Sequence, residues 1–104
     1  IIAVEWCPHC KEESQEIQRF YDEYKDKVNV LVIFTNSSSS LDKVKEYITK
    51  NGYSYPAYYD ADGSIIRGFG VTGFPFNLKI DNGKVVKQLE LPVNYEMMVK
   101  EMIE

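Results

Sequence analysis

The sequence predicts an α/β fold, with a mixed central sheet of four to five strands and helices on both faces. Short apolar runs typical of buried strands alternate with longer segments in which apolar residues recur at helical spacing. Further on, Asp81-Asn82-Gly83 separates two strand-like runs, and Asn-Gly between such runs is a strong hairpin signal. The alternating part predicts parallel strands, and the hairpin adds an antiparallel pair.

The first half of the chain predicts two strands and two helices. Residues 1–6 and 30–35 are apolar runs that read as buried strands. Between them an amphipathic helix begins at Pro8, because proline lacks the N–H that a first helical turn leaves unpaired. Its apolar residues are Ile17, Phe20, Tyr24 and Val28. A second helix with Leu41, Val44, Tyr47 and Ile48 is started by Ser39 or Ser40 and stopped by Asn51-Gly52.

The second half predicts shorter elements. A strand is expected at residues 55–59, closed by a turn at residues 60–63, and a short helix at residues 64–69. The two hairpin strands cover residues 76–80 and 84–91. A terminal helix follows at residues 94–103, where Tyr95, Met98, Val99 and Met102 recur at helical spacing.

Composition and charge narrow the class of protein. We expect residues 1–104 to form a single domain, since 104 residues with 44% hydrophobic content lie in the common single-domain range. The net charge of −4 argues against nucleic acid as a partner, because a duplex-binding surface needs a basic excess. The chain starts without Met inside an expected strand, so we expect it to be trimmed there, and a membrane anchor outside these residues stays open.

The sharpest signal is Trp6-Cys7-Pro8-His9-Cys10, where a predicted strand gives way to a helix. Two cysteines three positions apart on a first helical turn have Cα atoms about 5–6 Å apart, within disulfide range. The Cys7 sulfur would face unpaired backbone N–H groups at the positive end of the helix, which favours the nucleophilic thiolate. Cys10, one turn further in, would be the resolving thiol that attacks a mixed disulfide on Cys7.

His9 bears on the direction of electron transfer. An imidazole beside Cys7 would stabilise the thiolate, and stabilising the reduced form makes the disulfide a stronger oxidant. Glu12 and Glu13 oppose this effect, but we expect both carboxylates to be distant and screened by solvent. His9 therefore favours an oxidant.

Other uses of the two cysteines have less support. Zinc needs four ligands, and the chain has no Cys or His beyond this motif. Haem attachment requires the His after the second Cys, and a disulfide that closes four residues stabilises little. Two alternatives stay open: a Cu(I)-binding dithiol module, and a redox-inert interaction domain that keeps the fold.

Beyond the Cys box, the chain resembles a known superfamily. Trp6-Cys7 before an amphipathic helix, and the later Gly73-Phe74-Pro75 before a strand and the hairpin, are similar to the thioredoxin superfamily. The segments at residues 53–60, 62–63 and 69–71 resemble its TlpA-like branch, whose members are extracytoplasmic thiol–disulfide oxidoreductases. The resemblance implies a thioredoxin-like fold, and the branch favours a reductant, so the direction stays open.

The resemblance also implies roles for further residues. Pro75 matches the superfamily's cis-proline, which packs beside the disulfide and leaves the backbone of Phe74 free to pair with a substrate strand. Trp6 would provide an apolar shelf beside Cys7, and Pro8 lies inside the reactive motif. The expected partners are protein thiols or disulfides and an upstream redox protein, with no metal or organic cofactor, and we expect a monomer.

The chain departs from the superfamily at two places. Thioredoxin has a buried acid six residues before the first Cys, where this chain has Ile1. Its proton-transfer role is thus unassigned, and Glu5 is a candidate for it. After Pro75 the chain has Phe76-Asn77 where the branch usually has Thr-Thr, which predicts an altered partner groove.

Overall fold

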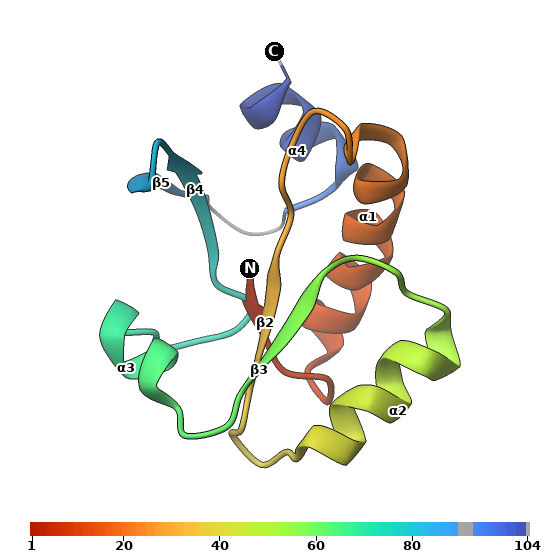
Figure 1. The fold of residues 1–104 in the computed structure, drawn as a ribbon, viewed down its shortest axis with the longest axis vertical. Coiled ribbons are helices and arrows are strands. Elements are labelled where there is room, and N and C mark those ends of the chain that lie inside the picture. The colour runs from red at the N-terminus through yellow and green to blue at the C-terminus, as the bar shows by residue number, and fades with distance from the viewer. Residues whose placement is uncertain (90–92, 104) are drawn as a thin grey trace.

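The computed structural model describes residues 1–89 and 93–103 (Figure 1). Its elements follow the predicted order of strands and helices. They are β1 (Ile2–Ala3), α1 (Pro8–Tyr24), β2 (Val32–Thr35), α2 (Leu41–Asn51), β3 (Ala57–Asp60), α3 (Ser64–Phe69), β4 (Asn77–Asp81), β5 (Lys84–Leu89) and α4 (Tyr95–Met102).

Three strands form the parallel part of the sheet, in the order β1-β2-β3. Ile2 of β1 is opposite Ile33 of β2, and Phe34 of β2 is opposite Tyr59 of β3. The helices α1 and α2 make the two crossovers, as parallel strands require. The predicted parallel interior is confirmed.

The hairpin β4–β5 pairs antiparallel, and among the described residues one bridge joins it to the parallel strands. At this bridge Ile2 N donates to Phe76 O (2.8 Å), and Phe76 N donates to Ile2 O (2.9 Å). The hairpin turn has positive φ at Asn82 (52°) and Gly83 (78°), as a type I′ turn needs. The sheet is therefore mixed, as predicted, and the segment just after Pro75 lies beside β1.

The helices cover both faces of the sheet, which the sequence also predicted. Both crossovers move along the sheet in one direction, so their shared handedness places α1 and α2 on the same face. Contacts from Tyr47 to Phe34 (ring centroids 6.1 Å apart) and from Tyr95 to Phe20 (6.4 Å) place α2 against β2 and α4 beside α1. Figure 1 shows α3 on the opposite side of β2 and β3 from α1 and α2.

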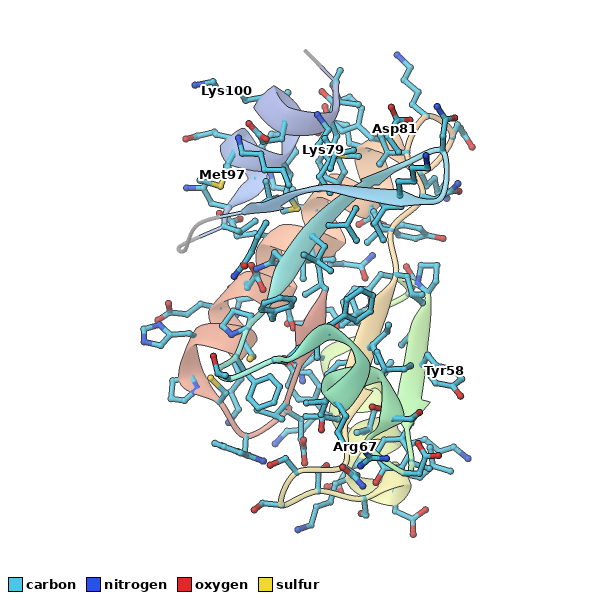
Figure 2. All side chains as sticks on the ribbon, turned by 90° about the vertical axis from the view of Figure 1, so that its left-hand side faces the viewer. Tyr58, Arg67, Lys79, Asp81, Met97 and Lys100 are labelled. Carbon is cyan, nitrogen blue, oxygen red and sulfur yellow. The ribbon has the colours of Figure 1, made fainter. Side chains whose placement is uncertain are left out.

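The main core lies between the sheet and the face of α1. Phe20 and Phe34 are each 1% exposed and are the largest of its fully buried side chains. Lys79 links the hairpin to α4, because its Nζ donates a hydrogen bond to Glu101 O (2.6 Å). Figure 2 shows Lys79 near the α4 residue Lys100. No helix in the described part of the chain is long and apolar enough to cross a bilayer.

Several boundaries differ from the sequence prediction. The first strand has two residues instead of six, because the chain turns at Glu5 and Trp6 to place Cys7 at the start of α1. The first helix ends at Tyr24, and Val28 packs against the core from beyond its end. The second hairpin strand is described to Leu89, and the last two residues predicted for it, 90–91, lie outside the described residues.

The ends of α2 follow the predicted caps, and they allow a first test. Ser40 Oγ accepts from Lys43 N (3.3 Å), and Gly52 adopts the left-handed conformation (φ 68°). We expect Ser40→Ala to lower the free energy of unfolding by about 1 kcal/mol, because a first-turn N–H loses its acceptor. Urea unfolding measures this change. An unchanged midpoint would show that the cap contributes nothing to stability.

Candidate active site

Cys7 is the N-cap residue of α1. Its backbone is extended (φ −82°, ψ 124°), and its carbonyl oxygen accepts from Lys11 N (3.0 Å). The side chain is partly exposed, and the thiol donates to Phe74 O (3.8 Å). The sulfur therefore lies where the unpaired N–H groups of the first turn concentrate positive potential, as the motif predicted.

Cys10 lies one turn further into α1 and is 2% exposed. Both cysteines are free thiols. Burial raises the pKa of the Cys10 thiol to about 12, and contact with Cys7 and the charge of Glu13 raise it further. The two thiols thus differ in the way the sequence predicted: Cys7 is accessible, and Cys10 is a protonated, buried group at neutral pH.

Glu13 is the site residue that the sequence interpretation missed. It was expected to be screened by solvent, but it is 4% exposed, and Asn77 Nδ2 donates to its Oε1 (2.8 Å). Burial raises the pKa of the Glu13 carboxyl to about 7, although the hydrogen bond from Asn77 lowers it. Glu13 follows Cys10 by three residues and precedes Ile17 by four, so helical spacing could have placed it on the buried face.

His9 and Glu12 lie on the solvent side of the same turn. The His9 side chain is 80% exposed, and its Nδ1 is 4.0 Å from Glu12 Oε2. A pair this exposed interacts weakly. The expectation of solvent screening is therefore right for Glu12 and wrong for Glu13.

Trp6 and Glu5 both contact the connection between β2 and α2. The Trp6 ring is 49% exposed, and its Nε1 donates to Ser37 O (2.9 Å), so it lies on the surface beside the β2–α2 connection. Glu5 Oε1 accepts from Ser39 Oγ (2.6 Å) in that same connection. Glu13, rather than Glu5, is the carboxyl whose charge acts on Cys10.

The segment before β4 completes the site. The Phe74–Pro75 peptide bond is cis, which agrees with the resemblance of this segment to the superfamily's cis-proline. A groove of about 730 Å³ runs beside Pro75 and His9, and the glutamates of α1 contribute to its wall. Within residues 1–89 and 93–103, no group of three or more His, Cys, Asp or Glu side chains could hold a metal ion.

A parallel β-α-β unit with a Cys-x-x-Cys pair at the start of its helix, faced by a cis-proline, defines the thioredoxin-like class of proteins. The chain belongs to the AhpC/TSA family, whose model matches residues 1–97. The family match confirms the resemblance to the thioredoxin superfamily, and the relatives described next confirm the TlpA-like branch.

Named relatives are similar along most of this chain. Sporulation thiol-disulfide oxidoreductase A of Bacillus subtilis is 28% identical over 96 residues, which are 89% of this chain and 58% of the relative. Thiol-disulfide oxidoreductase ResA of Bacillus thuringiensis is 29% identical over 86 residues, 82% of this chain and 49% of the relative. The chain therefore spans about half the length of the curated relatives that it matches.

Solved structures confirm the predicted fold. The crystal structure of StoA from Bacillus subtilis superposes with a TM-score of 0.87 at 25% identity, and the match covers 99% of this chain and 78% of that one. A secreted thiol-disulfide isomerase from Corynebacterium glutamicum shares the fold with a TM-score of 0.80 at 22% identity, covering 97% and 65% of the two chains.

Proposed function

We propose that this chain is the catalytic part of a protein thiol–disulfide oxidoreductase that acts outside the cytoplasm. The observation that supports it most is the unequal cysteine pair, with an accessible Cys7 at the start of α1 and a buried Cys10 one turn in. The relatives named above carry this activity in their names. The substrates would be cysteines or disulfides of other proteins.

The first step is an attack by the Cys7 thiolate on a partner disulfide. One partner sulfur forms a bond with Cys7, and the other leaves as a thiolate with the electron pair of the broken bond. The helix N-terminus stabilises the attacking anion. The product is a mixed disulfide at the surface of the molecule, where Cys7 is partly exposed.

The second step releases the partner. Cys10 must lose a proton before it attacks the Cys7 sulfur, and because burial raises the pKa of this thiol, it needs a base. Glu13 lies on the same buried face and has a carboxyl with a pKa of about 7, so it can accept that proton at neutral pH. The Cys7–Cys10 disulfide forms, and the partner disulfide has been reduced by two electrons to two thiols.

Partner docking would use the segment opposite Cys7. The carbonyl of Phe74 already contacts the Cys7 thiol, so a peptide paired with the backbone of Phe74 would bring its sulfur to the site. Pro75 and the groove beside it would hold the flanking residues of that peptide. Trp6 would border the site on the surface, and Pro8 starts the helix that positions both thiols.

The geometry favours a reductant. The case for an oxidant depended on His9, and its imidazole points into solvent beside Glu12. We infer a role in keeping partner cysteines reduced, with electrons from an upstream redox protein. The working unit would be a monomer that needs no metal or organic cofactor, and any membrane anchor would lie outside these residues.

Reduction of insulin disulfides with dithiothreitol as the electron source tests this function. The chain should accelerate the reaction catalytically, and equilibration with glutathione should give a potential nearer to about −270 mV than to about −120 mV, the values of thioredoxin and of DsbA. A value near the second would assign the oxidising direction. If insulin is not reduced, the redox proposal fails, and retention of Cu(I) against a modest chelator would then assign the metal-binding alternative.

A further inference from the structure

Glu13 and Asn77 form a buried polar contact in the core. Glu13 lies on α1 and Asn77 on β4, and the two side chains are 4% and 2% exposed. Their one hydrogen bond runs from Asn77 Nδ2 to Glu13 Oε1 (2.8 Å). It ties the helix that carries both cysteines to the strand that follows Phe74 and Pro75.

Each of the two side chains also has one oxygen without a hydrogen-bond partner among the described residues. Glu13 Oε2 and Asn77 Oδ1 are both buried, and both act as acceptors when Glu13 is ionised. Two buried acceptors cannot satisfy each other, and each unpaired one costs stability. A single proton on Oε2 changes this, because Oε2 then becomes a donor, and Asn77, already bonded to Oε1, has an acceptor oxygen without a donor.

We propose that Glu13 and Asn77 form an acid–amide pair, in which Oε2–H donates to Asn77 Oδ1 and holds the proton that Cys10 gives up. The inference rests on the proposed function. When Cys10 passes its proton to the Glu13 carboxylate, its thiolate attacks the Cys7 sulfur, and the partner thiolate leaves with the electron pair. In the reverse reaction Oε2 returns the proton to Cys10. Asn77 is then a positioning residue that acts through Glu13.

The other groups around Glu13 determine how readily it ionises. The Cys10 thiol faces it on α1. Burial favours the protonated acid. On β4 the facing group is the neutral amide of Asn77. Cys10 stays the same in the variants below, so it does not affect the comparison.

Exchanging the two groups tests the pair. Glu13→Gln gives two amides, Asn77→Asp gives two acids, and the double variant restores one acid and one amide with their positions exchanged. We expect urea midpoints to be flat with pH for Glu13→Gln and to fall steeply from about pH 5 to about pH 8 for Asn77→Asp, because two adjacent buried carboxyls cannot both ionise. At about pH 8 the double variant should have a folded-to-unfolded ratio at least about tenfold above that of Asn77→Asp.

The control is Asn29→Asp, which places a new acid at an exposed position before β2 and should leave the pH profile between about pH 5 and about pH 8 unchanged. The pair is ruled out if the double variant is no more stable than Asn77→Asp. If Asn77→Asp does not fold, the infrared C=O stretching band of protonated Glu13 tests for the second hydrogen bond instead. That band should disappear in Glu13→Gln and move to higher frequency in Asn77→Leu, and an unmoved band would rule out the second hydrogen bond. Unfolding and infrared spectra need no redox activity, so a failed insulin assay would refute the proposed function without refuting the pair.

Discussion

Replacing Cys10 by serine is expected to stop turnover and to leave a partner covalently attached to Cys7. The serine hydroxyl cannot displace a thiolate from a disulfide, so the second step is lost while the first remains. Release by an external thiol is bimolecular, whereas Cys10 is held one helical turn from Cys7. We expect turnover to fall by at least about 10³-fold, because intramolecular attack has a very high effective molarity.

Mass spectrometry of Cys10→Ser mixed with an oxidised peptide measures the adduct, which should approach one peptide per chain. The matched control is the double variant Cys7→Ser with Cys10→Ser, in which no adduct should form. An adduct on that control, or normal insulin reduction by Cys10→Ser, would contradict the assignment of Cys7 as nucleophile and Cys10 as resolving thiol.

The sequence predicted the parts of the fold that local rules determine. Ser40 and Gly52 bound α2 because a hydroxyl cap and a left-handed glycine act within one turn of the chain. Asn82-Gly83 makes the hairpin turn for the same reason, since both residues tolerate positive φ. The Cys7 and Cys10 pair was equally visible, because its spacing and its place before a helix are read directly from the sequence.

The parts that were missed depend on tertiary contacts. A run of apolar residues predicts burial, but it does not show where a strand stops pairing, so β1 is shorter than its apolar run. Glu13 was judged by its charge, although its helical phase places it with Cys10 and Ile17 on the buried face. Its partner Asn77 is 64 positions further along the chain, and no local pattern joins the two.

Glu13→Gln is expected to stabilise the protein at high pH and to leave it unchanged at low pH. The pKa of an unperturbed glutamate carboxyl is 4.5, and the pKa of Glu13 in the folded chain is about 7, so the folded state binds more protons than the unfolded state between these two pH values. Stability from Glu13 is therefore complete below about pH 4.5 and is lost as pH rises through about 7. Removing the charge should raise the free energy of unfolding by about 3 kcal/mol at about pH 8.

Urea unfolding at about pH 4 and about pH 8 measures this difference. The matched control is Glu12→Gln on the same helical turn, whose side chain is 81% exposed, and it should change stability by less than about 0.5 kcal/mol at either pH. An equal effect of Glu13→Gln at the two pH values would mean that Glu13 ionises normally in the folded chain.

Glu13→Gln should also lower the rate of the reaction, although it raises the free energy of unfolding. Glutamine cannot accept the Cys10 proton, so the release of the partner from Cys7 should become slower. The rate of release should also no longer increase as pH rises through about 7, because this increase reports the ionisation of Glu13. Stopped-flow measurement of partner release gives this profile. A variant that is more stable and slower would show that Glu13 lowers stability at neutral pH because proton transfer needs a buried carboxylate there. A variant that is more stable and equally fast would show that some other group takes the proton from Cys10.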